Sequence, residues 1–309
     1  MSEFERRALL GAAGVAGMAA LARAGGAGPI DPPAGAVGPS GHTLDDVYNK
    51  IPSFPNGSGD GRIAIAGGST PIIISQSGSY VLTGNIAVGA AVAVTISASH
   101  VTLDLNGFAV SAAVGASSVV SIGPSSSTTN VDVRNGTVAG GVIGVALSGA
   151  ANLTLEDLRI VGPKQYGIVT QSGGTQARNV VVRRCRVMDV GASTTSADSN
   201  MTIIAISISS AGTVIADNAI GSLSYNGSGT VTFRAISISG PGAASALIAG
   251  NLINCSPAVV STSTFPSTGI SFATNIAGVV RNNTVIGFTT PYAAFNGAGG
   301  VMTDGGGNV

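Results

Sequence analysis

Residues 205–209 read AISIS, and the same five letters return at residues 235–239, 30 positions further along the chain. From the first isoleucine onward, apolar and polar residues alternate in both copies, which is the period of a β-strand with one buried face. Two identical strands at this separation indicate an internal repeat, in which each strand has an equivalent one repeat later. The repeat is therefore the feature from which the fold can be predicted.

The repeat continues on both sides of this pair. One apolar position recurs every 22 to 33 residues, and a second apolar position follows it by five residues. The first series is Leu82, Leu105, Val133, Leu155, Val182, Ile215, Ile248 and Val280, and the second is Ala87, Val110, Val138, Ile160, Val187, Ile220, Ile253 and Val285. Short strands and tight turns at these intervals predict an all-β chain wound as a parallel β-helix. We expect a solenoid of about eight or more rungs, with each strand pairing with its equivalent one rung away.

Asparagines recur in the turn between the two apolar positions. They stand three residues after the first position, at Asn85, Asn218, Asn251 and Asn283. Asn tolerates the left-handed backbone conformation, and stacked Asn side chains can hydrogen-bond to one another along the axis. We therefore expect these residues to adopt that conformation and to form a ladder.

Two segments carry a family resemblance, SGSYVLTGNI at residues 77–86 and SHVTLDLNGF at residues 99–108. Together with the repeated coils, they resemble bacterial right-handed parallel β-helix proteins of the pectin-lyase-like superfamily, over roughly residues 61–309. The resemblance implies a right-handed coil. It implies little about chemistry, because that superfamily includes lyases, hydrolases, epimerases, adhesins and phage spikes.

The N-terminal region is typical of an exported protein. Arg6 and Arg7 precede an uncharged run from Ala8 to Ala22, and residues 22–24 offer a small-x-small cleavage site. We predict an export signal at residues 1–24 that resembles twin-arginine signals, although Glu5 stands where that class prefers Ser or Thr. Residues 25–60 are expected to form a linker and an N-terminal cap with one short capping helix. The protein would then be periplasmic, on the cell surface or extracellular.

Composition restricts the partners. Fourteen basic and fourteen acidic side chains cancel, so nothing in the overall charge favours nucleic acid or an anionic membrane. No segment after the export signal is long and apolar enough to predict a membrane span. Cys185 and Cys255 are expected about two rungs apart, roughly 10 Å, which is too far for a disulfide.

Charged residues concentrate on the rungs that contain Leu105, Val133, Leu155 and Val182. The register places Asp104 and Asp132 side by side, about 5 Å apart, which suits a pair of catalytic carboxylates. In a lyase of the resembling superfamily, clustered carboxylates would hold calcium, and Asp104 and Asp132 are the candidate ligands. Arg134 and Arg183 are the candidates for the base or for charge neutralisation. Candidate substrate-binding residues are Asn106, Glu156, Arg159 and Arg186.

A structural interpretation of the same residues is also open. Arg134, Glu156 and Arg183 alternate in sign along one column, as in an ordinary cross-strand salt-bridge ladder. Two hypotheses for function follow. The chain is either an exported protein that binds extracellular polysaccharide, with or without cleaving it as a lyase or glycoside hydrolase, or a non-catalytic structural, adhesive or spike-like surface protein. Calcium is the only cofactor considered, and self-association is a further expectation.

Overall fold

The computed structural model describes residues 61–124, 128–171, 177–239, 244–255, 257–259, 265–273, 276–293 and 302–309. All of them belong to one compact unit, Ser53–Val309. The predicted export signal (residues 1–24), linker and capping helix (residues 25–60) lie outside the described residues. In the part of the chain that is described, no helix is long and apolar enough to cross a membrane.

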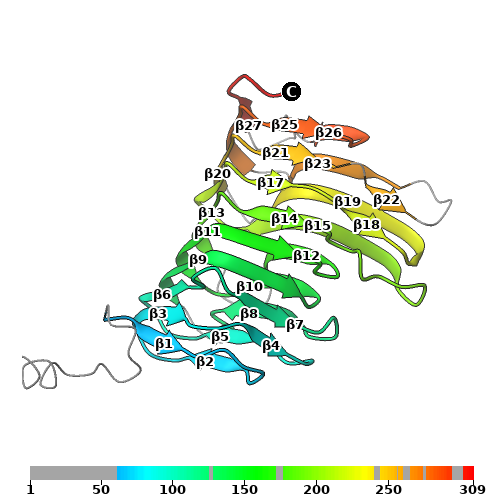
Figure 1. Cartoon of the computed structure of the whole chain (residues 1–309). Coiled ribbons are helices and arrows are strands. Elements are labelled where there is room, and N and C mark those ends of the chain that lie inside the picture. Colours follow the sequence, from blue (N-terminus) through cyan, green and yellow to red (C-terminus); the bar gives the residue numbers. More distant parts are fainter. Residues whose placement is uncertain are drawn as a thin grey trace, which may run out of the picture. The chain divides into compact units, whose positions relative to one another are not determined.

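The described strands form coils with three sides, and every pairing between them is parallel (Figure 1). The first sheet contains β1 (Ile63–Ile65), β3 (Gly78–Leu82), β6 (Val101–Asp104), β9 (Thr129–Gly140), β11 (Ala151–Val161), β13 (Arg178–Arg183), β16 (Thr213–Ala216), β20 (Ala244–Ala249), β24 (Ile276–Arg281) and β27 (Met302–Asp304). Beyond a turn, it continues into the short strands β4 (Ile86–Val88), β7 (Ala109–Ala112), β14 (Arg186–Met188), β17 (Ala219–Ile220), β21 (Leu252–Asn254) and β25 (Thr284–Ile286).

The second sheet contains β2 (Ile72–Ile74), β5 (Val94–Ile96), β8 (Ser118–Ile122), β10 (Ile143–Leu147), β12 (Tyr166–Thr170), β15 (Ser199–Ser209), β19 (Ser228–Ser239), β23 (Ser267–Phe272) and β26 (Thr290–Ala293). A small outlying pair is formed by β18 (Ser224–Tyr225) and β22 (Ala258–Val259). Nine successive strands in the second sheet correspond to nine rungs within the described residues. The predicted parallel β-helix is confirmed.

The core follows the predicted apolar columns over most of the chain. From Val133 to Val280, the residues of the first series pair with one another rung by rung and are fully buried. From Val138 to Val285, the second series does the same and is also buried. Burial of each aliphatic side chain stabilises the fold by about 1.5 to 3 kcal/mol relative to exposure. These columns therefore supply much of the free energy that stabilises the β-helix.

The predicted register is wrong in the first rungs. Leu103, not Leu105, pairs with Val133, and Ile86, not Ala87, pairs with Val110. The first shift arises in the turn after β6, which holds two more residues than the turn within β9. Asn106 and Gly107 in that turn both have positive φ angles, 51° and 79°. Since Leu103 and Leu105 are both buried, their apolar character alone could not show which one pairs with the next rung.

The Asn ladder is present and buried. The backbone N and Nδ2 of Asn218 donate to Oδ1 of Asn251 at 3.0 and 2.9 Å, and Asn251 donates to Asn283 in the same way at 3.0 and 2.8 Å. Asn308 continues the ladder beyond Asn283. Asn85 is not part of it, because its side chain is exposed and accepts from the backbone of Ala109.

Ladder bonding and left-handed backbone belong to different residues, so the prediction that the ladder asparagines would adopt positive φ angles is wrong. The left-handed position is one residue earlier, at Asn135, Asp157, Arg184, Asp217, Gly250 and Asn282. In the rungs of the buried ladder, Asp217, Gly250 and Asn282 make the sharp bend, and the asparagine that follows each of them turns its amide inward and donates to a strand carbonyl. Two functions that Asn can serve are thereby divided between neighbours.

A second Asn ladder lies on the outside of the coil. Asn179 donates to Asn152 at 2.8 Å, and Asn152 donates to Asn130 at 2.9 Å. All three have positive φ angles and exposed or half-exposed side chains. The two ladders have the same chemistry but differ in burial.

Both cysteines are free, as the register predicted, and both are buried. Burial raises the pKa of the Cys185 thiol to about 12, and it also raises the pKa of Cys255. A thiol that stays protonated is a poor nucleophile, so these residues act as core side chains.

Candidate functional site

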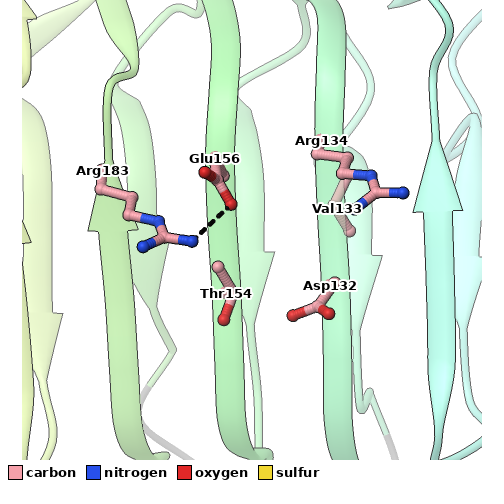
Figure 2. A pocket seen from close by; sticks show the side chains of 6 residues that line it. All are labelled: Asp132, Val133, Arg134, Thr154, Glu156 and Arg183. Atoms are coloured by element: carbon pink, nitrogen blue, oxygen red, sulfur yellow. Dashed lines mark hydrogen bonds and ion pairs between the residues drawn. The ribbon is translucent and has the colours of Figure 1, made fainter. Parts of the chain in front are cut away.

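A small charged pocket lies on the outer face of the first sheet, across β9, β11 and β13 (Figure 2). Its volume is about 180 Å³, and it is lined by Asp132, Val133, Arg134, Thr154, Glu156 and Arg183. Thr154 stands opposite Asp132, and Glu156 stands between Arg134 and Arg183 on the neighbouring rungs. Four of the predicted site residues, Asp132, Arg134, Glu156 and Arg183, are therefore brought together.

Most charges in this pocket are already paired. Glu156 binds Arg183 at 2.9 Å and also contacts Arg184, while Asp157 receives two hydrogen bonds from Arg184 at 2.9 and 3.2 Å. One step of the salt-bridge ladder that the alternating charges suggested, Glu156 to Arg183, is therefore present, whereas among the described residues Arg134 pairs with Asp104 and not with Glu156. Asp132 differs, because its carboxylate makes no hydrogen bond or ion pair with another described residue. It is the candidate carboxylate that remains available for a ligand.

Asp104 is not beside Asp132, so that prediction was wrong. The longer turn after β6 shifts the register, and Asp104 stands opposite Arg134 instead. Its Oδ2 accepts from Nη1 of Arg62 at 3.0 Å and lies 3.8 Å from Nε of Arg134. Its Oδ1 accepts from the backbone N of Asn106 at 2.8 Å and from Nδ2 of Asn135 at 3.0 Å. Asp104 therefore fixes the turn.

Asn106, predicted to bind substrate, also stabilises the turn after β6. Besides its bond to Asp104, its Nδ2 donates to the carbonyl of Leu82 at 3.2 Å. Its left-handed backbone, together with that of Gly107, forms the two-residue extension of the turn. These contacts account for its side chain without a ligand.

The predicted calcium site does not fit this geometry. Calcium takes six to eight oxygen ligands, and several of them are normally carboxylate oxygens. Both oxygens of Asp104 are engaged by nitrogen donors, and Asp132 stands in a different register position. Among the described residues, no group of three or more His, Cys, Asp or Glu side chains is placed to hold a metal ion.

Arg159 and Arg186 lie apart from the pocket lining, on β11 and β14 beyond the turn. They are directly opposite each other in the register, and both side chains are exposed. The predicted binding residues thus divide into the pocket group and this pair.

A larger hollow, which sequence analysis missed, lies on the outer face of the second sheet. Its volume is about 560 Å³, and it is formed by β10, β12, β15 and β19. The lining is Ile143, Tyr166, Val169, Thr170, Gln171, Ser207, Ser209 and Ser239. We call this surface the serine groove. It has no acidic or basic lining residue, and it combines hydroxyl and amide groups with one aromatic ring.

The strand register explains how the serine groove forms. Outward-facing side chains stack in columns: Ile143 beside Tyr166, Val169 beside Ser207, and Ser209 beside Ser239. The rungs are about 4.8 Å apart, so each column offers a new side chain at that interval. The alternating serines of the AISIS repeats were the available sequence signal, because the isoleucines between them are buried.

An ion pair fixes the segments that lead into the groove strands. Nζ of Lys164 lies 2.6 Å from Oδ1 of Asp198, joining the segment before β12 to the segment before β15. The hydrogen bond from Lys164 and that from the backbone of Thr195 lower the pKa of Asp198. The edge of the groove near Tyr166 is therefore held in place by an ion pair whose carboxylate, Asp198, stays ionised at neutral pH.

Comparison with known proteins gives no family. No family model matches the chain, and no curated protein matches it. Among solved structures, it is similar to an alginate lyase from Paenibacillus sp. str. FPU-7, with 10% identity and a TM-score of 0.38 over 74% of this chain and 99% of that one. It is also similar to DFA-IIIase from Arthrobacter chlorophenolicus A6 without its lid, with 10% identity and a TM-score of 0.29 over 72% of this chain and 83% of that one.

Proposed function

We propose that the chain is an exported protein that binds a polysaccharide along the serine groove. The observation that carries the proposal is the uncharged groove of about 560 Å³ extending over four rungs. Sugar hydroxyls form hydrogen bonds with Ser, Thr and Gln side chains, and a sugar ring can pack against Tyr166. A chain of sugars lying along the axis would meet equivalent side chains at every rung.

The charged pocket supports binding of a polymer less well. It has less than half the volume of the serine groove, and Glu156 and Arg183 already form an ion pair with each other. Export is proposed from Arg6, Arg7 and the uncharged run after them. An extracellular or periplasmic location would bring the groove to polysaccharides outside the cytoplasm.

Salt dependence of binding tests the proposal. We expect a neutral polysaccharide from a broad panel to bind with an affinity that changes less than about twofold between low and high salt, because no charged side chain lines the groove. Affinity electrophoresis and calorimetry measure this directly. Failure of every glycan to bind would overturn the proposal, as would binding that disappears at high salt.

Cleavage of a uronate-containing polysaccharide is a second proposed function, located at the charged pocket. The specific observation is the Asp132 carboxylate, which has no described partner and lies in a pocket with Arg134 and Arg183. Assays of reducing ends and of unsaturated uronate absorbance should detect product. A general base contributes about 10²- to 10⁴-fold, so Asp132→Asn should lower the rate by about 10² or more, while Arg178→Gln should not. Equal rates for Asp132→Asn and wild type would exclude this role.

A further inference from the structure

Arg159 and Arg186 form a pair of like charges that the fold places together. Arg159 on β11 and Arg186 on β14 occupy the same register position on adjacent rungs, about 4.8 Å apart along the axis. Both side chains are exposed. Like charges directly opposite each other on a sheet destabilise it, so the arrangement has a cost unless something compensates it.

The nearby carboxylates do not compensate this pair. Glu156 and Asp157, on the same rung as Arg159, bind Arg183 and Arg184 instead. The register neighbours on the two flanking rungs are Thr137 and Ala219, which carry no charge. Within the described part of the chain, neither Arg159 nor Arg186 forms an ion pair. This differs from Arg62, Arg134, Arg183 and Arg184, each of which has a carboxylate within 4 Å.

We propose that Arg159 and Arg186 together bind a doubly charged oxyanion, either phosphate, free or as a monoester, or sulfate. Two guanidinium groups one rung apart can each direct two N–H donors at one tetrahedral anion, which neutralises both charges. The site lies on β11 and β14, whereas the serine groove lies on β10, β12, β15 and β19, so it is independent of the proposed polysaccharide site. The occupant is defined by its charge and tetrahedral shape.

The test is calorimetry and thermal unfolding of the full chain with inorganic phosphate, inorganic sulfate or chloride at equal ionic strength. Phosphate and sulfate should bind saturably and raise the melting temperature, and chloride should not. Arg159→Gln and Arg186→Gln should each weaken binding about tenfold or more, since each removes charge-assisted hydrogen bonds. Arg178→Gln, which removes another exposed arginine of β13, should bind like wild type.

Two further measurements identify the chemical source of the bound anion and test whether its binding depends on charge. Glucose 6-phosphate should bind as inorganic phosphate does and glucose should not, if the natural occupant is a phosphomonoester; binding of free phosphate alone would assign the site to the free ion. Glucose 6-phosphate affinity should also fall as the pH drops through about 6, where the phosphomonoester dianion is protonated, while sulfate affinity stays constant. Equal loss of binding in Arg178→Gln, or unchanged binding in the Arg159→Gln/Arg186→Gln double variant, would overturn the proposal. Binding of neutral polysaccharide is measured separately, so either of these results would leave the proposed polysaccharide site standing.

Discussion

Replacing Asn251 with Ala should destabilise the β-helix by about 3 kcal/mol or more. The side chain of Asn251 accepts two hydrogen bonds from Asn218 and donates to Asn283 and to the carbonyl of Ile215. All of these groups are buried, and Ala would leave several of them without partners at about 1 to 3 kcal/mol each, partly relieved by relaxation. Urea unfolding followed by circular dichroism measures the effect as a lower midpoint.

The exposed ladder provides the matched control. Asn152→Gly removes the same amide from the outer ladder while keeping a residue that accepts its φ angle of 55°. Water can replace the lost bonds there, so this variant should cost less than about 1 kcal/mol. If Asn251→Ala and Asn152→Gly proved equally stable, burial would not be what makes the inner ladder important.

Replacing Tyr166 with Ala should weaken polysaccharide binding about 30-fold. Tyr166 is the aromatic side chain among the groove-lining residues, and its ring lies on the outer face of β12 beside Ile143. An aromatic residue central to a binding surface typically contributes about 2 kcal/mol, which corresponds to that change in affinity. Calorimetric titration with the polysaccharide identified from the panel measures it.

Two variants make this result specific. Tyr166→Phe keeps the ring and loses only a hydroxyl whose described side-chain contact is a 3.4 Å bond from Gln165, so it should bind within about threefold of wild type. Arg183→Gln alters the charged pocket and should leave binding in the serine groove unchanged. Loss of binding in Arg183→Gln but not in Tyr166→Ala would move the polysaccharide to the first sheet.

The sequence predicted the fold well because the signal is repeated. Each rung buries an aliphatic residue at the same place, as at Val182, Ile215 and Ile248. A wrong alignment of one rung therefore does not change the fold that the other rungs predict. The predicted strand register was wrong where a turn changed length. Leu103 and Leu105 are both apolar and both buried, and only the added Asn106 and Gly107 decide which pairs with Val133.

The candidate site was less predictable for the same reason. A shift of two residues put Asp104 opposite Arg134 instead of Asp132, and a supposed carboxylate pair became a turn held by an ion pair. The serine groove was missed because its lining comes from rungs separated by loops of unequal length, so Tyr166 and Ser207 do not align by inspection. Ser residues are also common on any solvated strand, and only pairing shows that they share one hollow.

Hydroxyl-radical footprinting with mass spectrometry tests most directly whether the polysaccharide lies in the serine groove. Tyr166 lines that groove, and Met188 lies on β14 of the first sheet, so the two oxidisable side chains report on different surfaces. We predict that saturating polysaccharide lowers the oxidation rate of Tyr166 severalfold and leaves that of Met188 unchanged. Protection of Met188 with no change at Tyr166, or no protection at either residue despite measured binding, would contradict the account.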